Sequence, residues 1–318
     1  MSNQLRVGIM LPTGVNQWGQ GTDPRALIDF AVRAERLGYA SLWVNDSLLT
    51  PRIEALTMLA ALAPVTERIA LGTAALLPVL RRPILAAQSI ASVDLLSGGR
   101  LVVAVGGAFP GRFGQPMHTL SEVPWQRRFV RLDETVALWR QLWTSDAPTS
   151  FHGEILQFDE IPTGTRPARP GGPPIWLGGA TPTALARTGR LYDGWLPYPP
   201  DPADYAAGLV QVRQAATEAG RDPDAISPAL MVTMAVVDDR ESGRALLDLY
   251  SRANYGVPLE ALETIQALAA GPPAYLADWL GRYVEAGARQ IVVRLGALDL
   301  AGQIEQLERI AELHAALK

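Results

Sequence analysis

Short, continuously apolar segments alternate along the chain with longer segments whose apolar residues recur at helical spacing. An apolar run without polar alternation is typical of a parallel strand that is covered on both faces. Eight such runs predict strands at Leu5–Leu11, Ser41–Asn45, Ile69–Leu76, Leu101–Val105, Pro174–Gly178, Gly194–Pro197, Ala229–Val237 and Gln290–Leu295. Eight strands alternating with helices predict an α/β fold of the (β/α)8 TIM-barrel type, whose usual length is about 250 residues.

Helix start and stop signals stand between these runs. Asp23-Pro24 predicts an N-cap followed by proline in the first turn, and Gly38 ends that helix. Pro83 opens another helix, which Ser97-Gly98-Gly99 ends because glycine tolerates a left-handed backbone. Further helices are expected at Leu132–Trp143, Pro202–Ala219, Ala274–Ala286 and Leu300–Leu317.

The chain is longer than a minimal barrel, and the excess lies in three insertions. Phe109–Trp125 follows strand four, Asp146–Pro173 precedes strand five with a small hairpin around His152-Gly153, and Asp238–Pro273 follows strand seven as a helical segment. Loops after barrel strands line the active face, so we expect the first and third insertions to cover the site. No GxGxxG motif supports a doubly wound sheet, and we expect residues 1–318 to form a single domain.

Composition narrows the function to a globular enzyme. The net charge is −4 and no basic cluster occurs, which argues against nucleic acid and anionic membranes as partners. A strand predicted from Leu5 leaves no room for a signal peptide, and no apolar window reaches the roughly 20 residues of a membrane span. We therefore expect a cytoplasmic protein. With no Cys and three widely separated His residues, we expect no metal site.

Small residues end two consecutive strands. Thr73, Ala74 and Ala75 end the third strand, and Gly106-Gly107 follows the fourth. Carboxyl ends of neighbouring parallel strands meet at one edge, and small side chains there allow a flat molecule to approach the backbone. These five residues are candidate cofactor-binding positions.

A third candidate position follows the fifth strand, where Gly178, Gly179, Ala180 and Thr181 precede Pro182 and Thr183. A helix N-terminus exposes unpaired N–H groups and a partial positive charge, so it can hold a phosphate. Thr181 can equally be a simple N-cap before Pro182, which needs no ligand. The residues alone leave both interpretations open.

Four segments in order carry a resemblance to a known family: Ala34–Asp46, TERIALGTAALL, LLSGGRLVVAVG and Pro173–Trp195. Together they resemble the bacterial luciferase-like family of flavin- and deazaflavin-dependent oxidoreductases, from Val7 to about Trp195, with Ala286–Gly296 as a plausible last strand. The resemblance implies a TIM barrel with an insertion. It also implies a cofactor phosphate at Gly178–Thr183 and a cofactor ring against a non-proline cis peptide within Thr73–Ala75.

The chain departs from that family at two points. Members of the family often place His after the acidic residue that ends strand two, whereas Ser47 follows Asp46 here. Some relatives place a carboxylate after the strand-four glycines, where this chain has Ala108. An unassisted serine is a poor proton acceptor, and His118 in the following insertion is a candidate to compensate. The catalytic candidates are Asp46, Ser47 and His118, and Asp46 is also a candidate to bond the cofactor.

These departures favour oxygen chemistry over hydride abstraction. We expect a monooxygenase that uses reduced FMN and O2 on a small organic substrate, with an F420-dependent hydride-transfer enzyme and a non-catalytic flavin-binding barrel as alternatives. The acidic F420 tail needs basic partners, and Arg187, Arg190 and Arg294 offer only modest support. We therefore expect FMN to bind more tightly. A separate flavin reductase is a candidate partner, and we expect a homodimer or higher homo-oligomer.

Overall fold

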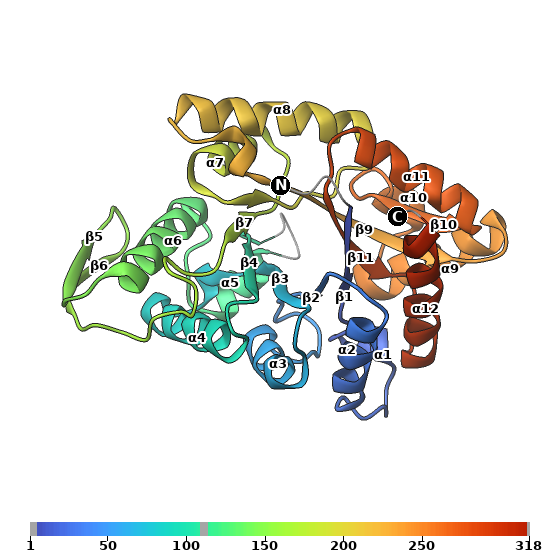
Figure 1. Cartoon of the computed structure of the whole chain (residues 1–318), viewed down its shortest axis with the longest axis horizontal. Helices are drawn as coiled ribbons and strands as arrows, with labels where there is room; N and C mark the ends of the chain where they lie inside the picture. Colours follow the sequence, from blue (N-terminus) through green and yellow to red (C-terminus); the bar gives the residue numbers. More distant parts are fainter. Residues whose placement is uncertain (1–4, 109–113, 317–318) are drawn as a thin grey trace. The chain divides into compact units, whose positions relative to one another are not determined.

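The computed structural model describes residues 5–108 and 114–316, and its contacts divide the chain into two compact units. Unit 1 comprises residues 1–44 and 176–318, and unit 2 comprises residues 45–175. Figure 1 labels the elements of both. The single-domain expectation stays a prediction.

The strand order of the main sheet is β10-β9-β11-β1-β2-β3-β4-β7-β8, and β8 also pairs with β9. Eight parallel strands alternating with helices therefore form the closed barrel that the sequence predicts. The eight strands are β1 (Arg6–Met10), β2 (Ser41–Val44), β3 (Ala70–Leu76), β4 (Leu101–Val105), β7 (Ile175–Leu177), β8 (Gly194–Trp195), β9 (Ser227–Val236) and β11 (Gln290–Leu295).

Unit 1 holds most of the barrel strands and their helices. Its helices are α1 (Val15–Trp18), α2 (Ala26–Arg36), α7 (Pro182–Leu191), α8 (Pro202–Glu218), α9 (Arg240–Tyr255), α10 (Leu259–Leu262), α11 (Pro273–Glu285), α12 (Leu300–Ala316) and the short η4 (Pro223–Ala225). The prediction for α2 is wrong at its start. Asp23 accepts from the Arg25 amide at 2.9 Å, and the helix begins at Ala26.

A close polar contact inside unit 1 explains why β1 contains glycine. Trp43 Nε1 donates to Ser41 Oγ at 2.7 Å, and Gln290 Nε2 donates to the same hydroxyl at 3.2 Å. A Cβ on Gly8 would lie 2.1 Å from Ser41 Oγ, so a side chain there would disrupt these hydrogen bonds.

Figure 1 shows α7 beside α8. The two helices pack closely because Gly189 of α7 has no side chain: a Cβ there would lie 2.3 Å from the Val212 carbonyl oxygen of α8.

The insertion after β9 differs from its prediction. It forms α9 and α10 as expected, but also a strand, β10 (Leu268–Gly271), which pairs in parallel with β9 from Leu268 opposite Thr233. Four small or apolar residues at the end of a helical segment give too short a pattern to separate strand from helix.

Unit 2 contains β3 and β4, paired in parallel, and a predicted hairpin. Its other elements are α3 (Ala55–Leu62), η1 (Ala63–Val65), η2 (Pro78–Leu80), α4 (Pro83–Leu96), α5 (Gln115–Leu120), α6 (Arg128–Thr144), β5 (Thr149–His152) and β6 (Gln157–Ile161). The hairpin β5–β6 confirms the prediction and lies beside α6 (Figure 1). Glu134 of α6 accepts from the amides of Glu154 and Leu156 at 2.7 and 2.8 Å, which fixes the hairpin turn. The first residues of the insertion expected after β4, 109–113, lie outside the described residues.

Within residues 5–108 and 114–316, no helix has the length and hydropathy needed to cross a membrane.

Candidate cofactor and catalytic site

Asp46 follows β2 and is held by a guanidinium group. Its Oδ2 lies 2.5 Å from Arg81 Nη1 and its Oδ1 lies 3.2 Å from Arg81 Nη2, while the Leu77 amide donates to Oδ2 at 3.0 Å. Arg81 also pairs with Glu54 at 2.6 Å. With both carboxylate oxygens occupied, Asp46 is suited to fixing the strand ends and poorly suited to accepting a proton. Arg81 was not among the sequence candidates, although it directly follows the third strand and its short helix.

The hydroxyl of Ser47, the next residue, contacts a thioether and a backbone amide. Its Oγ contacts Met117 Sδ at 3.6 Å and accepts from the Leu49 amide at 3.2 Å. In the described part of the chain, no His, Asp or Glu side chain bonds Ser47. A serine with these partners can orient a neighbouring group but lacks the assistance that general-base catalysis requires.

The ends of β3 and β4 carry the small residues that the sequence predicts. The Ala74–Ala75 peptide is cis, which agrees with the family resemblance, and Thr73 Oγ1 donates to the Ala104 carbonyl at 2.8 Å. A Cβ on Gly106 would lie 3.7 Å from Ala75 Cβ. At Gly107 a Cβ would meet the Phe129 ring at 2.7 Å, so Gly107 allows this aromatic ring to cover the end of β4. Whether a cofactor uses these atoms stays a prediction.

His118 lies in α5 and is completely buried, whereas its place in a loop-like insertion is more typical of a solvated histidine. The ring packs edge-on against Trp125 with centroids 4.9 Å apart, and Nδ1 lies 3.3 Å from the Pro124 carbonyl oxygen. Because a carbonyl oxygen only accepts, we assign the proton of the neutral ring to Nδ1. Nε2 then carries a lone pair, is buried, and has no hydrogen-bond partner among the residues described.

Burial lowers the pKa of His118 below its usual value of 6.5, while the carbonyls of Pro124 and Gly107 act in the opposite direction. The ring is therefore neutral at pH 7. A buried polar atom without a partner is uncommon in folded proteins and calls for a functional explanation. His118 combines a neutral ring, an available acceptor atom and a position near the end of β4.

The lowered pKa of His118 predicts a pH dependence of stability. Below about pH 6.5 the unfolded state binds a proton on His118 that the folded state does not, so the free energy of unfolding falls as the pH falls from there toward the folded pKa. Urea unfolding of the parent chain and of His118→Asn measures this between about pH 7.5 and 5.5. The free energy of unfolding of the parent chain, relative to that of the variant, should decrease toward acid pH. A difference between the two chains that stays constant with pH would contradict this prediction.

In unit 1, the glycine pair after β7 leads directly into α7. Thr181 is the N-cap, and its Oγ1 accepts from the Ala184 amide at 3.3 Å, while Pro182 is the first helical residue. The backbone of Gly179 has a φ of +98°, which favours glycine. Ala180, Thr181 and Thr183 are exposed. The capping alternative is therefore confirmed as geometry. Pro182 has no N–H, and the amides of Ala184 and Leu185 donate to Thr181, so in the first turn of α7 the Thr183 N–H is the donor left for an anion among the described residues.

Sequence reasoning missed the residue that holds this loop. Trp195 of β8 is fully buried, stacks on Tyr205 with centroids 5.0 Å apart, and donates from Nε1 to the Gly179 carbonyl at 2.8 Å. The Trp195 side chain therefore holds the glycine loop through this hydrogen bond. The sequence shows only a tryptophan in a very short strand. A tryptophan at such a position is typical of the hydrophobic core, so it did not indicate this role.

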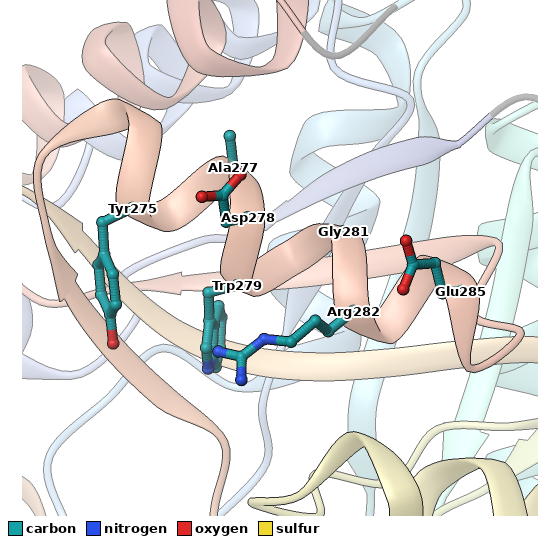
Figure 2. A pocket seen from close by; sticks show the side chains of 7 residues that line it. All are labelled: Tyr275, Ala277, Asp278, Trp279, Gly281, Arg282 and Glu285. Atoms are coloured by element: carbon teal, nitrogen blue, oxygen red, sulfur yellow. The ribbon is translucent and has the colours of Figure 1, made fainter.

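Two surface cavities are lined mainly by residues of helices. One of about 330 Å³ is formed by residues of α11 alone, among them Tyr275, Trp279 and Arg282 (Figure 2). Another, of about 600 Å³, lies between α3 and α4 and is also lined by Glu54 and Arg81, the ion pair described above. Active sites of barrels collect groups from several strand ends, so a surface lined by one helix is a poor candidate for the chemistry.

Comparison with known proteins agrees with this fold. The family model described as luciferase-like monooxygenase matches residues 5–290, and the chain belongs to that family. The F420-dependent glucose-6-phosphate dehydrogenase of Intrasporangium calvum is 27% identical over 93% of this chain and 96% of its own length. The enzyme of the same name from Amycolatopsis mediterranei is 34% identical over 59% of this chain and 57% of its own length.

A solved structure, monooxygenase RslO1 from Streptomyces bottropensis, superposes with a TM-score of 0.78 at 23% identity and 98% coverage of both chains. That likeness shows the fold. Family membership and the dehydrogenase relatives make the chain a luciferase-like oxidoreductase, and they give no support to a non-catalytic barrel.

Proposed function

We propose that this chain is an F420-dependent oxidoreductase that interconverts an alcohol and a carbonyl group on a small organic substrate. Support for the cofactor comes from the relatives named F420-dependent, one of which matches over almost its whole length. This choice reverses the preference for FMN drawn from the sequence. Support for the reaction comes from one observation: Nε2 of His118 is buried and has no hydrogen-bond partner within residues 5–108 and 114–316.

Each unit, taken by itself, has residues that suit one part of such a cofactor. Gly179, with its left-handed backbone, and the first turn of α7 offer a cradle for a phosphate. Ala74, Ala75 and Gly106 offer a surface without bulky side chains for a flat ring. When bound, the deazaflavin ring supplies two-electron chemistry by accepting or donating a hydride.

In this proposal, His118 accepts the proton that alcohol oxidation releases. Oxidation of an alcohol to a carbonyl group also releases the proton of the hydroxyl group, and that proton needs an acceptor in the protein. The neutral His118 ring accepts that proton at Nε2, and the Pro124 carbonyl keeps Nδ1 protonated and the ring oriented. In the reducing direction the same atom returns the proton to the substrate oxygen.

Asp46 and Ser47 have supporting roles in this proposal. Within unit 2, the Asp46–Arg81 pair holds the segment around Asp46 against the segment after β3, and Ser47 contacts Met117, the residue before His118. Both residues therefore position the loops that carry the reacting groups. Neither needs to move a proton.

Titration of each cofactor, followed by tryptophan fluorescence, tests the proposal. We expect F420 to bind at least tenfold more tightly than FMN, a difference of about 1.4 kcal/mol. Oxidised F420 should then be reduced by members of a panel of small alcohols. Tighter binding of FMN together with oxygen consumption by the reduced flavin complex would contradict the proposal.

That contrary result is the signature of the second candidate, an FMN-dependent monooxygenase. Ser47 in place of histidine and Ala108 in place of a carboxylate favour it, because oxygen transfer by the flavin does not need those groups. A separate flavin reductase is a partner of this candidate alone. A homodimer or higher homo-oligomer remains a prediction for both.

A further inference from the structure

Arg294 is a buried cation at the carboxyl end of β11, with 8% of its surface exposed. Its Nη1 donates to the Tyr255 hydroxyl and, at 3.2 Å, to Gln266 Oε1. Its Nη2 contacts Met231 Sδ at 3.4 Å. All these residues belong to unit 1, and the insertion after β9 supplies Tyr255 and Gln266. In residues 5–108 and 114–316, no carboxylate pairs with Arg294.

The phenols near Arg294 do not neutralise it. Burial raises the pKa of Tyr250 and of Tyr198 to about 12, although the Arg294 charge acts to lower both values. Both groups are therefore protonated at pH 7. Glutamine and methionine carry no charge either. A guanidinium group is always protonated in proteins, so the positive charge in this cluster is uncompensated.

Burying a charge without a counter-ion is unfavourable, so a buried charge of this kind calls for an explanation, and a bound anion is one. We propose that Arg294, with Tyr255 and Gln266, forms an anion site that receives a carboxylate or phosphate group of the substrate. The planar guanidinium fork suits both anions, and the Tyr255 hydroxyl, which donates to Gln266 Oε1 at 3.4 Å, helps to hold this cluster together. As a statement about the substrate, this inference rests on the proposed function.

The anion at Arg294 differs from the cofactor phosphate expected at α7. Within unit 1 the strand order β7-β8-β9-β11 separates the two positions by three strand spacings, about 14 Å in total. One phosphate cannot contact both places. The position of Arg294 at a carboxyl strand end, beside the insertion after β9, instead suits a group of the substrate.

Two substitutions test the anion site by opposite means. In Arg294→Gln the charge is lost, and the affinity for inorganic phosphate or acetate should fall at least about tenfold. In Gln266→Glu a carboxylate replaces the amide that Arg294 already contacts, so the charge gains an internal counter-ion. In sodium chloride, this variant should unfold at a higher temperature than the parent chain. Phosphate and acetate should no longer raise its unfolding temperature. Arg36→Gln, which removes an exposed arginine, is the matched control.

Thermal unfolding of the full chain is measured with phosphate or acetate against sodium chloride at equal ionic strength. The parent chain and Arg36→Gln should be stabilised by the anions. Absence of stabilisation, or an equal response in Arg294→Gln, would overturn the site. So would a Gln266→Glu variant that is less stable and keeps its response.

A second measurement distinguishes a substrate group from the cofactor tail as the anion that binds at Arg294. With saturating cofactor bound, the site at α7 is occupied, and the remaining response to phosphate should still depend on Arg294. If bound F420 abolishes the response, the cofactor tail occupies Arg294 and the assignment to the substrate is wrong. These measurements need no turnover, so their failure would leave the proposed cofactor and the role of His118 untouched.

Discussion

Replacing His118 with asparagine should lower kcat by roughly 100- to 10,000-fold, the usual contribution of a general acid–base group. Asparagine keeps a polar side chain but has no atom that accepts and returns a proton near pH 7. The measurement is steady-state turnover of F420 with a substrate identified for the parent enzyme. Cofactor affinity should change little, because the effect falls on the chemical step.

The pH profile gives His118→Asn its second readout. In the parent enzyme the rate of alcohol oxidation should fall at acid pH as the His118 ring becomes protonated, and the low pKa of this ring places that limb below pH 6.5. The variant should lack the limb. His152→Asn is the matched control, since His152 is exposed on the hairpin and its Nδ1 lies 3.0 Å from Gln157 Oε1. Equal activity of the two variants would remove His118 from the mechanism.

Replacing Gly179 with leucine should weaken the binding of both F420 and FMN by on the order of 100-fold. Two charge-assisted hydrogen bonds to a phosphate, at about 1.5 kcal/mol each, correspond to that loss. The leucine Cβ would lie 3.4 Å from Ala184 Cβ, and its longer side chain would cover the N-terminus of α7. Fluorescence titration of each cofactor measures the change.

Gly220→Leu is a control that also places a non-glycine residue at a positive φ. Gly220 has a φ of +71°, close to the left-handed value at Gly179, and a Cβ added to it would meet no atom within 4 Å. Both variants should lose about 1–2 kcal/mol of stability from the left-handed backbone. Only Gly179→Leu should lose cofactor. Unchanged binding in both would show that the phosphate lies elsewhere.

The barrel strands could be predicted from the sequence because each one is a local property of the chain. Residues such as Leu101–Val105 form an uninterrupted apolar run, and the preceding Ser97-Gly98-Gly99 ends α4 by its own backbone preference. The strand β10 was missed for the same reason: Leu268–Gly271 is too short to carry a local signal, and its pairing with β9 decides its conformation.

The sequence by itself determined the fold, the family and the small residues at the strand ends, since these depend on local pattern and on motif order. Only the tertiary structure decided the state of the reactive groups. Asp46 meets Arg81 across 35 positions. Among the described residues, His118 Nε2 has no hydrogen-bond partner, and the side chains that bond Arg294 are neutral. Charge compensation, burial and hydrogen-bond satisfaction depend on which side chains from distant segments share one neighbourhood, and folding alone sets that.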